Sequence, residues 1–180
     1  MQPGGDAAGP GLDAATDAAA NAAAADVVVT DAAAALSVQP LCSGVGTGAL
    51  LVLDEPLSFW GGTDLATGEI TDVHHPQRGL AVAGRVVAMA ASRGSSSSSS
   101  VLAEQLRAGV GPAAIVLTSR DAILALGALA ASELYDISMP IVLIGSDKIA
   151  ALSELAALSP DHTVTVRADS ASAMIEMGTA

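Results

Sequence analysis

The second half of the chain alternates between short apolar runs and longer amphipathic runs, and this alternation constrains the fold more than any other feature. Short apolar runs bounded by turn residues are typical of strands, and apolar residues spaced three and four apart are typical of helices. The pattern predicts a strand at 85–90, a helix that opens in the serine run and continues to Leu106, a strand at 113–117, a helix at 121–134, a strand at 140–144, a helix at 148–158 and a strand at 163–166.

The first half is richer in strands and loops. It predicts strands at 36–41 and 49–53, joined by a loop at Gly44, Gly46 and Gly48. These glycines form neither a GxGxxG nor a Walker pattern, so nucleotide binding is not supported. A first half of strands and loops, followed by alternating strands and helices, predicts an α/β fold class, as a layered β/β/α domain.

A long segment without clear periodicity, 54–84, connects the two halves and is rich in Gly, Pro, His and Asp. Loops of this length inside a compact domain are usually functional or disordered. Phe59 and Trp60 favour function, since they are two of only three aromatic residues in the chain. Their loop continues with Gly61 and Gly62, and it is either anchored by aromatic burial or a contact for substrate or another subunit.

Residues 1–31 carry five Asp, no basic residue and mostly Ala and Gly. This composition predicts a disordered or weakly helical extension without a site of its own, with a short docking helix as the alternative. The folded domain is then expected to span 32–180.

Charge and cysteine content exclude several functions. Seven basic against 19 acidic residues make a net charge of −12, so nucleic acid and anionic membrane are unfavourable partners. A single thiol, Cys42, can form no internal disulfide and cannot supply the several thiolates that an iron–sulfur cluster needs. The lone cysteine favours a reducing cytoplasm, and neither a signal peptide nor a membrane-spanning run is expected.

The strongest candidate site is Arg93-Gly94-Ser95-Ser96, where a predicted strand ends and a helix begins. Free backbone N–H groups at a helix start favour an anion, glycine permits close approach, and Arg93 can grip a carboxylate or phosphate. The alternative is that the six serines 95–100 are helix caps and a polar linker. The apolar run that follows, with Val101, Leu102 and Leu106, favours a packed helix instead.

Two further groups of polar residues have plain alternatives. Asp72-Val73-His74-His75-Pro76 is weak as a metal site because adjacent histidines rarely face one ion, so a histidine that holds a loop by hydrogen bonds is the preferred interpretation. No metal ligand is predicted in this chain. Asp54 and Glu55 could form a carboxylate dyad, although solvated turn charge is the simpler account.

Several of these motifs recur in one order: Pro56 to Asp64 (PLSFWGGTD), Gly68, Asp72 to Pro76 (DVHHP), Gly79, Gly84, Arg93-Gly94-Ser95 and Pro112-Ala113-Ala114. In this order they resemble the small, swivel-domain component of aconitase X, over about 36–144. That group includes small subunits of phosphomevalonate dehydratases and the corresponding part of cis-3-hydroxy-L-proline dehydratases.

The resemblance implies a swivelling β/β/α domain like the mobile domain of aconitase. It also implies a hydro-lyase whose iron–sulfur cluster sits on a separate large subunit, the expected partner, with a small anionic hydroxy acid as substrate. By this resemblance Ser95 is the catalytic base. The expected substrate-binding residues are Arg93, Gly94, Ser96, Phe59, Trp60, Gly61, Gly62 and His75.

The sequence departs from the family at Ser92 and within the serine run, where relatives often have Gly, and at Leu65, where Pro is common. The motif spellings resemble the bacterial hydroxyproline enzymes more than the archaeal phosphomevalonate enzymes. The expected substrate is therefore cis-3-hydroxy-L-proline, with (R)-5-phosphomevalonate as the alternative. A non-catalytic anion-binding module with the swivel fold is the second alternative.

Overall fold

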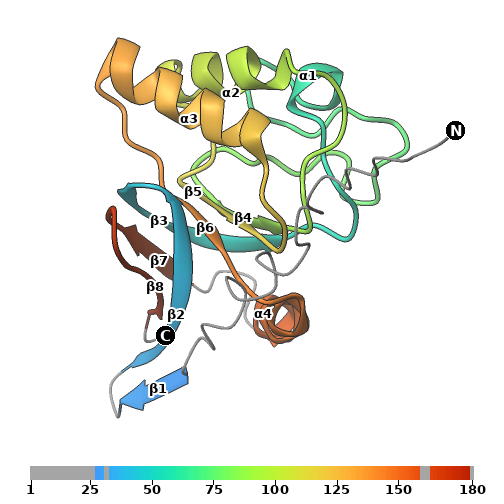
Figure 1. Ribbon diagram of the computed structural model, residues 1–180. Helices are drawn as coiled ribbons and strands as arrows, with labels where there is room; N and C mark the ends of the chain where they lie inside the picture. The colour runs from blue at the N-terminus through green and yellow to red at the C-terminus, as the bar shows by residue number, and fades with distance from the viewer. Residues whose placement is uncertain (1–26, 31–32, 159–162, 179–180) are drawn as a thin grey trace, which may run out of the picture.

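The computed structural model describes residues 27–30, 33–158 and 163–178 (Figure 1). Within the predicted extension, Val27–Thr30 forms strand β1, which pairs antiparallel with the start of strand β2, Ala33–Cys42. These four residues thus form a strand within the predicted extension. Residues 1–26, the rest of the predicted extension, lie outside the described residues.

The remaining elements follow the predicted alternation closely. They are β3 (Gly44–Val52), α1 (Phe59–Gly62), β4 (Val86–Met89), α2 (Ser98–Arg107), β5 (Ala114–Leu117), α3 (Ala122–Tyr135), β6 (Ile141–Leu143), a 3-10 turn (Ser146–Lys148), α4 (Ile149–Leu158), β7 (Thr163–Ala168) and β8 (Ala173–Met177). Every strand and helix predicted from 85 onward is confirmed to within two residues at each end. None of the helices in the described ranges is long and apolar enough to cross a membrane.

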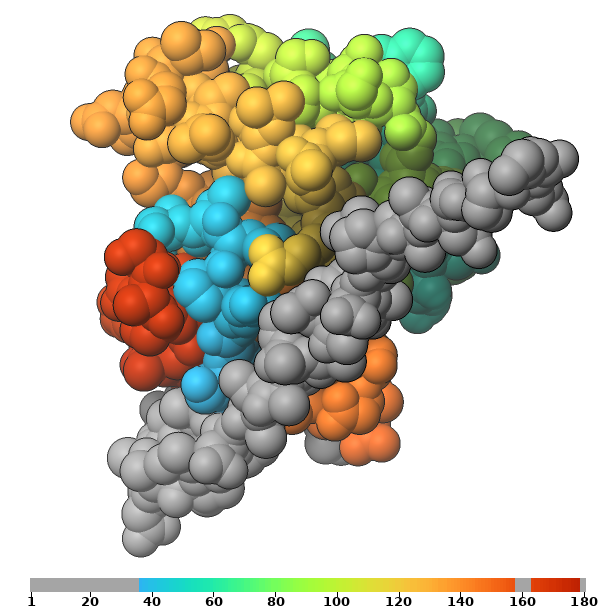
Figure 2. All heavy atoms as spheres, viewed as in Figure 1, coloured from blue at the N-terminus to red at the C-terminus, as the bar shows by residue number. Residues whose placement is uncertain are grey.

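Two long strands, β2 and β3, connect two sheets. β3 pairs with β7 through Gly44–Ala49 and then with β4 through Leu50–Val52, and β2 pairs with β8 and then with β6. Strands β3, β4, β5 and β6 are parallel, whereas β7 and β8 join by antiparallel pairing. In the space-filling view the β8 end of the chain, in red, lies beside β2, in blue (Figure 2). Helices α2 and α3 cover one side of the parallel strands and α4 lies on the other (Figure 1). This is the predicted β/β/α architecture.

The parallel strands are buried on both faces, which explains their continuous apolar runs. Along β4, Val87 and Met89 join the core under α2 and α3, while Val86 and Ala88 join the core that includes Leu152 of α4. The alternation follows from the two-residue period of a strand. The site loop is anchored in the first of these cores.

One predicted loop is wrong. Gly44, Gly46 and Gly48 do not join two strands but form the first part of β3. A Cβ atom at Gly46 would lie 1.9 Å from the Ala113 carbonyl oxygen, and one at Gly48 would lie 2.1 Å from the Gly84 carbonyl oxygen. The glycines therefore mark a close approach of backbones inside the sheet, a role that local sequence does not separate from a turn.

Candidate functional site

The candidate site is the turn between β4 and α2, at the carboxyl end of the parallel strands. Ser92 pairs with Leu57 in an isolated bridge, and the Arg93 N–H donates to the Leu57 carbonyl oxygen at 3.2 Å. Asp121 lies at the neighbouring strand end and caps α3. Its Oδ2 accepts from Ser92 N at 2.9 Å and also from the Ser92 hydroxyl, so both strand ends hold one turn in place.

Three consecutive backbone N–H groups in this turn are free. Within the described part of the chain, the amides of Gly94, Ser95 and Ser96 donate to no acceptor, and all three residues are exposed. Gly94 has φ +100°, and a Cβ there would lie 2.7 Å from Ser58 Oγ, so the turn requires glycine at this position. Successive free amides around a glycine are typical of anion-binding concavities, so this geometry favours the anion site that the sequence leads us to expect, which stays a prediction.

Ser95 projects from this turn with an exposed side chain. Its Oγ accepts a hydrogen bond from the Ser97 N–H at 3.2 Å, and its carbonyl oxygen accepts from the Ser98 N–H at 2.9 Å. The bond from Ser97 stabilises negative charge on the Ser95 oxygen. The hydroxyl thus belongs to the same exposed turn as the free amides.

The serine run is the start of a packed helix and not a linker, since α2 begins at Ser98. Ser98 is 1% exposed, and its hydroxyl accepts from the Trp60 N–H at 3.1 Å. Ser58 Oγ in turn donates to the Trp60 carbonyl oxygen at 2.8 Å. These bonds tie the aromatic loop to the helix that carries the site.

The two adjacent aromatics occupy different environments. Phe59 is fully buried and belongs to the core under α2 and α3, so it anchors the loop. Trp60 is 57% exposed and Gly61 is exposed beside it, which leaves both available for contact with another molecule. Gly62 is buried, and its carbonyl oxygen accepts from the amides of Thr71 and Asp72. Phe59 is therefore a buried anchor and not exposed for substrate as expected, while a contact made by Trp60 stays a prediction.

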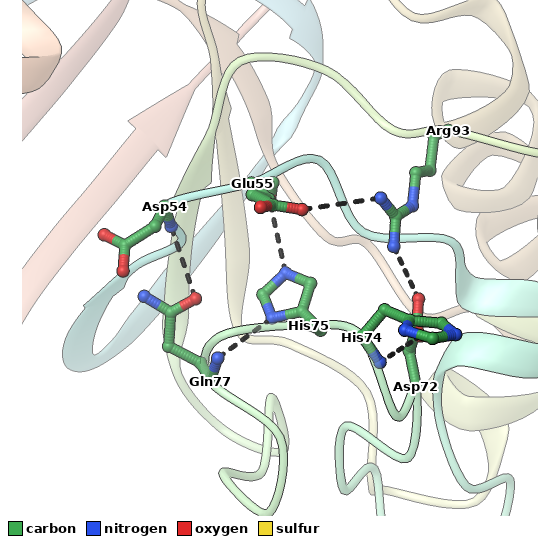
Figure 3. Close-up of polar contacts among 7 residues, drawn as sticks. All are labelled: Asp54, Glu55, Asp72, His74, His75, Gln77 and Arg93. Carbon is green, nitrogen blue, oxygen red and sulfur yellow. Dashed lines mark hydrogen bonds and ion pairs between the residues drawn. The ribbon is translucent and has the colours of Figure 1, made fainter.

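The Arg93 side chain lies between two carboxylates of the long loop (Figure 3). Its Nη2 donates to Asp72 Oδ2 at 2.5 Å, and its Nη1 is 3.6 Å from Glu55 Oε2. The backbone N–H of His74 and then the Arg93 guanidinium hold the pKa of Asp72 below its ordinary value. Arg93 is therefore oriented by the loop that also carries Trp60, and it lies two residues from Ser95.

His75 holds the loop by hydrogen bonds, as the preferred interpretation stated. It is 3% exposed, its Nδ1 accepts from the Gln77 N–H at 3.1 Å, and its Nε2 lies 3.1 Å from the Glu55 carbonyl oxygen. Because Nδ1 accepts, Nε2 carries the proton and donates to Glu55. Both ring nitrogens are used within the protein, so His75 positions Glu55 instead of facing a ligand directly. His74 is exposed beside it (Figure 3).

Sequence reasoning missed the residues that support this turn from elsewhere in the chain. Asp121 was expected only as the start of a helix, and its two bonds to Ser92 had no sequence signal. Burial alone would raise the pKa of Asp121, but hydrogen bonds from Ser92, Leu124 and Ile123 outweigh burial and lower it. Glu55 was expected as solvated turn charge, whereas it lies in the ion cluster around Arg93.

No metal site accompanies this turn. Among the residues described, no group of three or more His, Cys, Asp or Glu side chains could hold a metal ion. Cys42, the one thiol of the chain, is half-buried, with its Sγ 3.7 Å from the Ala125 carbonyl oxygen. Burial raises the pKa of this thiol and so disfavours the thiolate that binds metal.

Fold and turn together define a class: a small β/β/α domain with an exposed serine turn at the carboxyl end of its parallel strands. A family model for the aconitase X swivel domain matches residues 35–176, and the chain belongs to this family. A crystal structure of Thermococcus kodakaraensis aconitase X superimposes with a TM-score of 0.64 at 28% identity, covering 81% of this chain and 98% of that one.

Curated relatives carry two names. A cis-3-hydroxy-L-proline dehydratase of Pseudomonas aeruginosa is 46% identical over 113 residues, which are 62% of this chain and 20% of that protein. A phosphomevalonate dehydratase small subunit of Methanothermobacter thermautotrophicus is 39% identical over 88 residues, 49% of this chain and 67% of that protein. The chain thus spans about a fifth of the length of the hydroxyproline dehydratases that it matches.

Proposed function

We propose that this chain is the small, swivel component of a hydro-lyase of aconitase X type, which dehydrates cis-3-hydroxy-L-proline. The observation that carries the proposal is the turn itself: the Arg93 side chain, the Ser95 hydroxyl and three free amides come from four consecutive exposed residues. The substrate is supported by the 46% identity to the Pseudomonas aeruginosa dehydratase. The single cysteine supports a reducing compartment, the cytoplasm.

In this proposal the turn binds the substrate carboxylate and Ser95 takes a proton. Loss of water from a 3-hydroxy acid breaks the C–H bond next to the carboxylate and the C–O bond on the adjacent carbon, and a C=C bond forms between them. The hydroxyl leaves as hydroxide, which would be taken up by a Lewis acid or proton donor of the partner, since this turn supplies neither. The free amides and Arg93 stabilise the negative charge that develops on the carboxylate as the proton leaves. Ser95 accepts that proton as the deprotonated oxygen, which the Ser97 N–H stabilises.

Closure against a partner completes such a site. Ser95 and the free amides are exposed in this chain alone, and a serine hydroxyl in bulk water stays protonated and is then too weak a base. Covering the turn excludes water and strengthens the field of Arg93 and the amides. Trp60 and Gly61, exposed on the adjacent loop, are the proposed contacts with the covering surface and the substrate.

We assign any iron–sulfur cluster to that partner, since the residues of this chain do not fit one. Clusters are held by several Cys thiolates, and Cys42 is the only cysteine in the sequence. A large subunit as partner is supported by the name "small subunit" of the Methanothermobacter relative.

The second candidate is the small subunit of a phosphomevalonate dehydratase. Coverage of this relative supports it, since the match spans 67% of the Methanothermobacter small subunit. Its substrate, mevalonate 5-phosphate, is also an anionic hydroxy acid and could use the same turn. The two candidates differ in the substrate that the assembled enzyme dehydrates.

Co-expression with a cluster-bearing large subunit from the same genome, followed by assays on both substrates, tests the proposal. Turnover of cis-3-hydroxy-L-proline is the expected result, and turnover of mevalonate 5-phosphate alone would favour the second candidate. Ser95→Ala is expected to lose more than about 100-fold in kcat, with Ser100→Ala as a matched control outside the turn. Full activity in Ser95→Ala would refute Ser95 as the base, and no turnover on either substrate would favour a non-catalytic module.

A further inference from the structure

We infer that Glu55 selects a zwitterionic substrate, by pairing with an ammonium group on the carbon next to the carboxylate that Arg93 binds. The inference rests on the proposed function and identifies the ammonium group as the feature of the substrate that this site recognises. It starts from the two carboxylates that flank Arg93, which differ in how firmly the protein holds them (Figure 3).

Asp72 is a structural partner of Arg93. Its Oδ1 accepts from the His74 N–H at 2.9 Å while its Oδ2 accepts from Arg93 at 2.5 Å, and its side chain is 19% exposed. Both oxygens are therefore engaged, and Asp72 orients the guanidinium without being free for a ligand.

Glu55 is held in the opposite way, with a fixed backbone and a loose side chain. The buried His75 ring lies within hydrogen-bond distance of its carbonyl oxygen, at 3.1 Å. Its carboxylate is 50% exposed and has one partner in the described ranges, Arg93 at 3.6 Å, which is beyond hydrogen-bond distance. An exposed pair of this kind contributes little energy, so a ligand can replace it readily.

Arg93 keeps donors for a substrate while it is paired. A guanidinium has five N–H donors, and the described residues use one of them, on Asp72. A carboxylate bound to the remaining donors brings its neighbouring carbon beside Glu55. In cis-3-hydroxy-L-proline that carbon carries the positively charged ring nitrogen, which the Glu55 carboxylate can bind by a charge-assisted hydrogen bond.

A phosphorylated hydroxy acid presents the wrong charge for this arrangement. Mevalonate 5-phosphate has no cation next to its carboxylate, so Glu55 would gain no partner when that substrate displaces it from Arg93. Two carboxylates around one guanidinium leave the cluster with a net negative charge, which further disfavours a substrate with several negative charges. The mixed charge of the cluster therefore favours amino acids.

Two competitive inhibitors of the same shape separate these effects in the assembled enzyme. L-proline carries both the carboxylate and the ring ammonium, and cyclopentanecarboxylate replaces the ammonium with a methylene group. We expect Glu55→Gln to weaken inhibition by L-proline about 10- to 100-fold and to leave inhibition by cyclopentanecarboxylate unchanged or slightly stronger. Glu154→Gln, the same charge change on an exposed residue of α4, is the control and should change neither constant.

The outcomes distinguish a wrong substrate from a wrong role for Glu55. If the wild-type assembly does not dehydrate cis-3-hydroxy-L-proline, the proposed substrate is wrong and the role of Glu55 falls with it. If the wild type is active but Glu55→Gln leaves L-proline inhibition unchanged, the inference is overturned and the proposed function stands. Equal weakening of both inhibitors would also overturn it, because Glu55 would then act only by positioning Arg93.

Discussion

Removal of the Asp121 carboxylate is the sharpest test of how the fold supports the site. Asp121 is 9% exposed, and its Oδ1 accepts from the amides of Ile123 and Leu124 at 3.0 Å each, which caps α3. Its Oδ2 accepts two hydrogen bonds from Ser92. Asp121→Ala therefore removes the cap of α3 and also leaves the two Ser92 donors without their acceptor.

The expected decrease in the free energy of unfolding follows from these two losses. Loss of a helix cap costs about 1 kcal/mol, and donors left unpaired in a partly buried site cost about 1–3 kcal/mol. We expect Asp121→Ala to lower the free energy of unfolding by about 2–4 kcal/mol at pH 7, measured by urea denaturation. Glu133→Ala, on the exposed side of the same helix, is the matched control and should stay within about 0.5 kcal/mol of wild type.

The same variant has a defined pH dependence. The folded-state pKa of Asp121 lies below its ordinary value, so its carboxylate stabilises the fold above the unfolded pKa of about 3.9 and loses this effect as pH falls through the folded value. The difference between wild type and Asp121→Ala should therefore shrink as the pH falls below about 4. A difference below about 1 kcal/mol at pH 7, or one that grows on acidification, would refute this account of Ser92 and Asp121.

Three further predictions concern the turn and its loop. Gly94→Ala forces a side chain into φ +100° and toward Ser58 Oγ at 2.7 Å, so it should cost about 1–3 kcal/mol in urea denaturation and abolish turnover in the assembled enzyme. Phe59→Ala should cost about 3–5 kcal/mol because the ring is fully buried, whereas Trp60→Ala should leave stability within about 0.5 kcal/mol and weaken partner binding measured by titration calorimetry. Arg93→Lys should raise KM about tenfold at constant stability, because an ammonium cannot bind a carboxylate through two parallel hydrogen bonds. Equal unfolding energies for Phe59→Ala and Trp60→Ala, wild-type activity in Gly94→Ala or an unchanged KM in Arg93→Lys would each contradict the site described above.

Local sequence was enough to predict most of the architecture. The parallel strands are buried on both faces, so each is a continuous apolar run in the sequence. Such a run differs from the amphipathic pattern of the helices between them. The turn at 93–96 was predictable because the first amides of a helix have no partner within the helix, and Arg-Gly-Ser stands between a predicted strand and a predicted helix.

Tertiary structure decided what the neighbours of that turn are. The partners of Arg93 are Glu55 and Asp72, and the partner of Ser92 is Asp121, 29 residues further along the chain. A period of two or 3.6 residues carries no information about contacts at such separations, because they depend on the path of a long irregular loop. For the same reason, only the fold shows that Phe59 is buried while its neighbour Trp60 is exposed. Likewise, only the close packing of the β3 backbone against Ala113 and Gly84 explains why this strand requires glycine.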